Sequence, residues 1–160
     1  MTVEIVGIWI SPGHNFVGRH GKTPLAHPAI SVEQIECVAG RGARGDRFFD
    51  FKANYNGQIT FVAMETLERI QQILKLEKIP TGATRRNVHT RDVNLNELIG
   101  VTFELGGVKF EGTEECSPCK WMNYAIAPGA EELLRGHGGL RARVLSDGIL
   151  RTGKAELSWI

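Results

Sequence analysis

Cysteine is scarce in this chain of 160 residues, which contains three: Cys37, Cys116 and Cys119. An odd, small number argues against a disulfide scaffold and favours a reducing compartment, so we expect a cytoplasmic protein. Two of the three lie close together in a Cys-Ser-Pro-Cys segment. Soft metal ligands and sulfur nucleophiles are therefore expected at this one segment.

A charge imbalance and long apolar runs are also lacking. The formal net charge is +1, so composition gives no argument for nucleic acid or an acidic membrane surface as partner. No apolar run approaches the roughly 20 residues that span a bilayer. The N-terminus also lacks the layout of a signal peptide. With 42% hydrophobic and 23% charged residues, the length predicts one globular domain over residues 1–160.

Strand-like segments and tight turns dominate the chain. Apolar residues at helical spacing predict a helix over 64–78. Gly106-Gly107 between two strand-like segments predicts a hairpin. Shorter helices are expected at 94–98 and 128–135, and a long loop at 11–28. Strands are expected at 3–10, 31–38, 58–62, 101–105, 108–111, 140–145, 149–150 and 155–160. The sum is a mainly β fold, a closed β-barrel with a few peripheral helices.

The Cys-Ser-Pro-Cys loop is the first candidate site. Cys119 precedes residues 120–124, which could begin a helix, and a helix N-terminus next to Lys120 favours the thiolate form. A thiolate suits soft metals and sulfur transfer. The alternative is a pair of half-buried cysteines that shape a turn. Zinc would need two more ligands, and His137 is the only nearby candidate in the sequence.

Three further segments combine glycine or asparagine with arginine. Residues 40–47 allow close backbone approach to an anion, although a solvated basic loop is the simpler interpretation. Arg85-Arg86-Asn87 offers guanidinium forks and an amide, which suit a phosphate or a heterocycle edge. These arginines could instead balance surface glutamates. Arg141 and Arg143 are two apart on an expected strand and share a face, either as half of an anion site or as a wet outer surface.

In combination, these segments resemble the MOSC family, named for the C-terminal domain of molybdenum cofactor sulfurases. The resemblance covers roughly residues 31–156, and its elements occur in the family's order. They are Gly45-Asp46-Arg47, Arg85-Arg86-Asn87, Asn96 to Gly100, the Gly106-Gly107 hairpin, Glu111 to Cys119, and Gly138 to Val144.

The resemblance implies a β-barrel of the pyruvate-kinase-barrel type that holds a molybdopterin-type cofactor. It implies Cys119 as the molybdenum ligand and Cys116 as a possible redox neighbour. The residues it implies for the pterin and phosphate are Asp46, Arg47, Arg86, Asn87, Arg141 and Arg143. The chain looks like a compact stand-alone member, too short for the pyridoxal-phosphate half of the eukaryotic sulfurases, so pyridoxal phosphate is not expected. Zinc is not expected either, because no second Cys-x-x-Cys segment supplies the missing ligands.

The implied reaction is oxo transfer at molybdenum, with reductive cleavage of the N–O bond of a small N-hydroxylated substrate. Electrons would come from a separate flavin or iron–sulfur protein, because the chain has no motif for either group. Two other classes remain open. A sulfur carrier would hold a persulfide on Cys119, and a non-catalytic redox module would close a Cys116–Cys119 disulfide.

Overall fold

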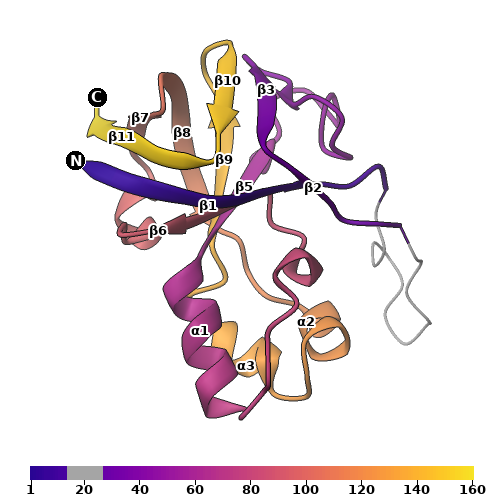
Figure 1. Ribbon diagram of the computed structural model, residues 1–160. Helices are drawn as coiled ribbons and strands as arrows, with labels where there is room; N and C mark the ends of the chain where they lie inside the picture. Colours follow the sequence, from indigo (N-terminus) through magenta and orange to yellow (C-terminus); the bar gives the residue numbers. More distant parts are fainter. Residues whose placement is uncertain (14–26) are drawn as a thin grey trace.

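The computed structural model describes residues 1–13 and 27–160 and shows a β-barrel with helices gathered at one end (Figure 1). Seven strands form the ring in the order β11-β7-β8-β9-β5-β6-β1, and pairing of β1 with β11 closes it. The bounds are β1 Thr2–Ile10, β5 Ile59–Ala63, β6 Val88–Arg91, β7 Thr102–Leu105, β8 Val108–Glu115, β9 Leu140–Val144 and β11 Gly153–Trp159. The closed barrel and the mainly β class expected from the sequence are confirmed.

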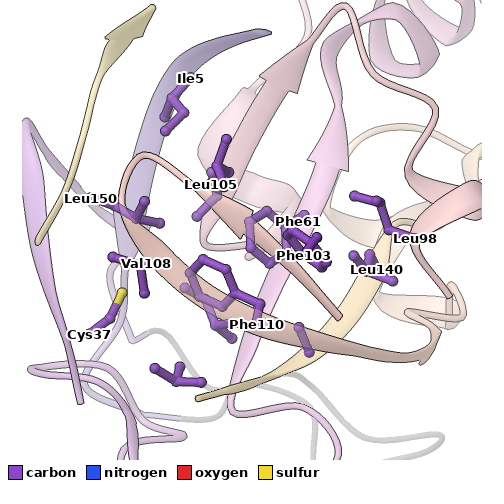
Figure 2. Close-up of a cluster of buried hydrophobic side chains, with 14 of the residues drawn as sticks. Ile5, Cys37, Phe61, Leu98, Phe103, Leu105, Val108, Phe110, Leu140 and Leu150 are labelled. Carbon is purple, nitrogen blue, oxygen red and sulfur yellow. The ribbon is translucent and has the colours of Figure 1, made fainter. Parts of the chain in front are cut away.

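Alternating side chains fill the barrel. In β9, Leu140, Ala142 and Val144 are buried while Arg141 and Arg143 face outward, as the period of two predicts. Three phenylalanines, Phe61, Phe103 and Phe110, meet in the interior with ring centroids 5.5 to 6.2 Å apart (Figure 2). Burial of each such ring contributes about 1.5–3 kcal/mol to stability.

A smaller sheet and one short strand extend the barrel. Strands β10 (Gly148–Arg151), β3 (Gln34–Val38) and β4 (Gly42–Ala43) form the second sheet, and β2 (Ile30–Val32) pairs with β1. Cys37 on β3 is fully buried in the main core, and burial raises the pKa of its thiol to about 12. This thiol is therefore protonated and inert at neutral pH.

The helices belong to the connections between strands. Strands β5 and β6 pair in parallel, which requires a crossover, and that connection contains α1 (Met64–Ile73) and the 3-10 helix η1 (Thr81–Thr84). Helices α2 (Lys120–Ala125) and α3 (Ala130–Leu134) complete the layer, and the 3-10 helix η2 (Leu95–Leu98) follows β6. A second apolar cluster joins this layer to β5, and its buried members are Val62, Leu67, Ile70, Met122, Ala130 and Leu134. No helix in the described parts of the chain is long and apolar enough to cross a membrane.

Several element boundaries differ from the sequence expectation. The helix expected over 64–78 ends at Ile73, because Lys75 adopts a left-handed conformation with φ +55°. Strand β6 was not expected, and the strand expected over 31–38 is divided between β2 and β3. The hairpin turn at Gly106-Gly107 is confirmed, with positive φ at both glycines. Most of the loop expected over 11–28 lies outside the described residues.

Candidate functional site

The Cys loop, residues 116–119, connects the end of β8 to the start of α2. Cys116 is buried, and its N–H donates to the carbonyl of Gly139 at 2.8 Å. Cys119 is half-buried and occupies the N-cap position of α2, so the helix expected after it is confirmed. The two thiols of the loop therefore have different surroundings, one beneath the surface and one at it.

Two glycines let the loop approach the barrel closely. A β-carbon on Gly138 would lie 2.2 Å from the Cys116 carbonyl oxygen, and one on Gly139 would lie 2.0 Å from the Phe61 carbonyl oxygen. Both distances are far below van der Waals contact, and Gly139 also has φ +115°. The Gly138-Gly139 pair is thus required for the loop to pack against the end of β5.

Arg141 and Arg47 surround the Cys116 side chain. The Arg141 guanidinium lies near enough to the Cys116 side chain for the two to interact electrostatically. Although burial opposes its charge, Cys116, Tyr55 and Glu114 together raise the pKa of Arg141 above its usual range. Arg47 is mostly buried, and burial lowers its pKa; Asp46 opposes this decrease, and the nearby Arg86 adds to it. Two guanidiniums thus share the surroundings of one sulfur atom.

Donor capacity remains on both of these arginines. Arg47 donates to Asp46 Oδ1 at 3.3 Å and to the Arg85 carbonyl at 3.2 Å, and its guanidinium lies 4.6 Å above the Phe48 ring. Arg141 also makes a long contact of 3.5 Å with Glu114. A guanidinium has five N–H groups, so each retains donors that could bind an anion.

Arg86 uses its side chain to hold the Cys loop. Its Nη2 donates to the Cys116 carbonyl at 2.9 Å and its Nε to the Gly138 carbonyl at 3.0 Å. A weaker contact at 3.4 Å reaches the Thr84 carbonyl. The contacts of Arg86 therefore hold the backbone of the Cys loop in place and join it to Gly138.

Asn87 is fully buried between three strands. Its Oδ1 accepts from the Thr60 N–H at 3.0 Å and from the Thr60 hydroxyl at 3.1 Å, and its Nδ2 donates to the Trp9 carbonyl at 3.1 Å. These contacts join β1, β5 and the start of β6. The amide that the sequence suggested for a heterocycle edge is engaged with the protein itself.

Arg143 is bound to the protein on its outer face. It pairs with Glu111 at 2.8 Å, hydrogen-bonds to the Asn56 side chain, and contacts the Asn54 carbonyl at 3.4 Å. Arg141 and Arg143 share a face, as expected, and Arg141 is the one of the two that lies within electrostatic influence of Cys116.

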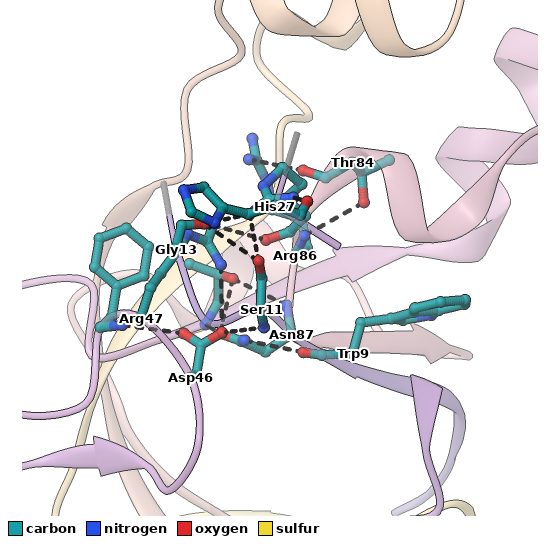
Figure 3. Close-up of polar contacts among 12 residues, drawn as sticks. Trp9, Ser11, Gly13, His27, Asp46, Arg47, Thr84, Arg86 and Asn87 are labelled. Carbon is teal, nitrogen blue, oxygen red and sulfur yellow. Dashed lines mark hydrogen bonds and ion pairs between the residues drawn. The ribbon is translucent and has the colours of Figure 1, made fainter. Parts of the chain in front are cut away.

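Asp46 supports the site from within. Its carboxylate accepts from the Ser11 N–H at 3.0 Å and the Phe48 N–H at 3.3 Å, besides pairing with Arg47 (Figure 3). Arg85 extends this network to Ser11. Sequence reasoning missed Ser11 and Tyr55, since nothing local marks a lone serine after a strand or a tyrosine in an asparagine-rich turn.

Metal-ligating residues do not cluster in the described part of the chain. No group of three or more His, Cys, Asp or Glu side chains there is placed to hold an ion. His137, the nearest candidate zinc ligand in the sequence, lines a cavity of about 390 Å³ with Glu65, Asp92 and residues 93–96. A structural zinc ion needs about four ligands, and the described residues around the Cys loop do not provide such a set.

Comparisons with known proteins identify the fold and the family of the chain. The chain resembles the crystal structure of APC1665, the YuaD protein from Bacillus subtilis, with a TM-score of 0.77 and 18% identity over 100% of this chain and 97% of that one. The crystal structure of YiiM from Geobacillus stearothermophilus is similar with a TM-score of 0.68 and 18% identity, over 99% of this chain and 75% of that one. The crystal structure of YiiM from Escherichia coli is similar with a TM-score of 0.65 and 16% identity, over 99% of this chain and 70% of that one. A search of curated proteins gives no match. The family model described as MOSC domain matches residues 45–155, so the chain belongs to the MOSC family.

Proposed function

We propose that this protein binds a molybdopterin-type cofactor at the Cys loop and reduces N-hydroxylated substrates there. The MOSC family is associated with molybdenum cofactor binding. The observation that carries the proposal is the placement of Arg47 and Arg141, which face the Cys loop with unused donors.

The residues present fit such a group. Cys119 supplies one thiol at the surface of the loop, which is the contribution expected where the cofactor provides the other metal ligands. Arg47 and Arg141 would bind the cofactor's anionic groups. Arg86, Gly138 and Gly139 would keep the Cys loop in a fixed position against the barrel. The bound group would accept the oxygen atom of the substrate.

The chain's own residues would bind, orient and partly enclose the reactants. The net reaction cleaves an N–O bond, consumes two electrons and two protons, and releases an amine-type product and water. The electrons come from a separate flavin or iron–sulfur protein. The three free thiols accord with the reducing cytoplasm as the compartment.

Cofactor content after expression in a molybdenum-competent host tests the proposal. We expect near-stoichiometric molybdenum and pterin in the wild type and loss of the metal in Cys119→Ala, with Cys116→Ala as the matched thiol control. The proposal would be falsified by a wild-type protein that contains no metal and whose metal and pterin content equals that of Cys119→Ala. Mass spectrometry that finds a persulfide on Cys119 without metal would identify a sulfur carrier instead.

The two arginines of β9 give a matched pair for the anion contacts. Arg141 retains donors near Cys116, whereas Arg143 is bound to Glu111 and Asn56. We expect Arg141→Gln to lower the affinity for the pterin roughly 10- to 150-fold, as loss of a charged hydrogen bond of about 1.5–3 kcal/mol implies, and Arg143→Gln to retain it. Equal losses would show that both arginines contact the cofactor, as the family resemblance alone implies.

A further inference from the structure

Arg85 has a backbone conformation that an arginine seldom adopts. Its φ is +60°, in the left-handed region, at the end of η1. A residue with a β-carbon is strained there, and glycine would relieve the strain. Its side chain is buried, with 8% of the residue exposed. Strain of this kind persists where the contacts of the side chain outweigh it, and it concentrates at functional sites.

The Arg85 guanidinium joins two separate parts of the chain. Nη1 donates to the His27 carbonyl at 3.0 Å, and Nη2 donates to the Gly13 carbonyl and the Ser11 hydroxyl, both at 2.5 Å. Gly13 and His27 stand on either side of residues 14–26 in the sequence. The side chain therefore fixes both flanks of that segment to the barrel.

The same guanidinium belongs to a closed ring of hydrogen bonds. Arg85 donates to the Ser11 hydroxyl, and the Ser11 N–H donates to Asp46 Oδ1. Arg47 donates to the same Asp46 oxygen and to the Arg85 carbonyl (Figure 3). Buried polar networks of this kind hold their side chains in one orientation, because a side chain that rotated away would leave a buried polar group without a hydrogen-bond partner.

The ring contains two cations and one carboxylate away from water. Burial, with the nearby Arg47, lowers the pKa of Arg85 to about 10, against the opposing attraction of Asp46. Arg86 adds a further positive charge beside Arg47. The buried charge is thus unbalanced toward positive, which favours an anion at the open side of Arg47.

We propose that Ser11 and Arg85 are positioning residues that orient the Arg47 guanidinium toward the Cys loop. This inference rests on the proposed function, since it concerns the anion contact assigned there to Arg47 and Arg141. Neither positioning residue touches the anion. Ser11 holds Asp46 through its N–H and Arg85 through its hydroxyl, and Arg85 presents the carbonyl that fixes the second nitrogen of Arg47. Arg47 is thereby held at two nitrogens, which leaves its remaining N–H groups for an anion.

Inorganic phosphate is the probe for the anion site, measured by calorimetry on the full cofactor-free chain. We expect Ser11→Ala and Arg85→Gly to weaken phosphate binding roughly tenfold, the effect of about 1.4 kcal/mol. Ser11→Thr, which keeps the hydroxyl, should restore it. Lys75→Gly is the matched control for Arg85→Gly, because Lys75 has a similar positive φ of +55° and lies outside the ring.

Arginine side-chain NMR gives a second measure that needs no ligand. Two held nitrogens restrict rotation of the Arg47 guanidinium, so its terminal N–H resonances should be separate in wild type, Ser11→Thr and Lys75→Gly. They should merge in Ser11→Ala and Arg85→Gly, because each variant removes the bond between the Arg85 guanidinium and the Ser11 hydroxyl that holds the Ser11 N–H and the Arg85 carbonyl in place. Arg47→Lys gives the assignment. Unchanged Arg47 resonances in both variants would overturn the inference, whatever the phosphate result. Phosphate binding that survives Arg47→Lys and Arg141→Gln would instead overturn the proposed anion site.

Discussion

Single residues of the Arg-Arg-Asn segment have three different tasks. Arg85 holds the chain at Ser11, Gly13 and His27, Arg86 holds the Cys loop, and Asn87 joins strands of the barrel. Their side chains leave one backbone segment in different directions and fix three structures around the site. The three side chains of this segment therefore form their hydrogen bonds mainly with the protein itself.

Asn87 allows this view to be tested at the level of one residue. Asn87→Ala would leave the Thr60 and Trp9 backbone groups without a partner inside the barrel. Each unsatisfied buried group costs about 1–3 kcal/mol, so we expect the free energy of unfolding to fall by roughly 2–6 kcal/mol. Urea denaturation of the cofactor-free wild type and of Asn87→Ala measures this difference in the free energy of unfolding. A loss below about 0.5 kcal/mol, the usual scatter for surface changes, would assign Asn87 to ligand binding alone.

At the scale of elements, the end of α1 shows how tertiary structure decides a boundary. The Leu76 N–H donates to the Gln71 carbonyl at 2.9 Å and the Lys75 N–H to the Gln72 carbonyl at 3.2 Å. This pair of bonds is a Schellman motif, in which the left-handed position, here Lys75, is usually glycine. The apolar periodicity continues past Ile73 and gave no sign of the stop.

Lys75→Gly should therefore stabilise the protein. A β-carbon in the left-handed region costs about 1–2 kcal/mol, and the extra freedom of glycine in the unfolded chain offsets about 0.5–1 kcal/mol of that gain. We expect the free energy of unfolding to rise by up to about 1 kcal/mol in urea titrations. Lys75→Ala, which keeps the β-carbon, serves as the control and should give no such gain. A destabilised Lys75→Gly would show that the lysine side chain itself supports the turn.

Elements with strong local patterns were predictable, and those shaped by packing were not. The Gly106-Gly107 hairpin, the alternation of β9 and the helix after Cys119 follow from local chemistry. Strand β6 was missed because its four residues, Val88 to Arg91, include a histidine and an arginine and it pairs in parallel with distant β5. The arginines of the candidate site were recognised as a set, but their partners lie far away in the sequence. Which of them are bound to the protein itself and which retain unused donors therefore required the structure.

For the whole molecule, the contact between the barrel and the helical layer contains a buried histidine. His89 on β6 is 1% exposed, and its ring centroid lies 6.3 Å from that of Trp9. Among residues 1–13 and 27–160, no group hydrogen-bonds to its Nε2. Burial lowers the pKa of His89 to about 4, with the Arg86 charge adding to the effect and a hydrogen bond to the Arg86 backbone opposing it. The folded protein thus keeps this side chain neutral over a range in which the unfolded chain is protonated.

This difference predicts an acid-sensitive fold. The unfolded chain binds a proton at His89 below pH about 6.5, whereas the folded protein binds it only near pH 4, so the free energy of unfolding decreases as pH falls between these values. The shift corresponds to about 3 kcal/mol at 1.36 kcal/mol per pKa unit. Urea titrations at steps from pH 7.5 to 4 should show this decrease in the wild type and a flatter profile in His89→Gln, which cannot take up the proton. The matched variant His137→Gln, at a surface loop, should keep the wild-type slope. If the free energy of unfolding of His89→Gln depends on pH as steeply as that of the wild type, protonation of His89 is not the cause of the acid sensitivity, and the carboxylates are.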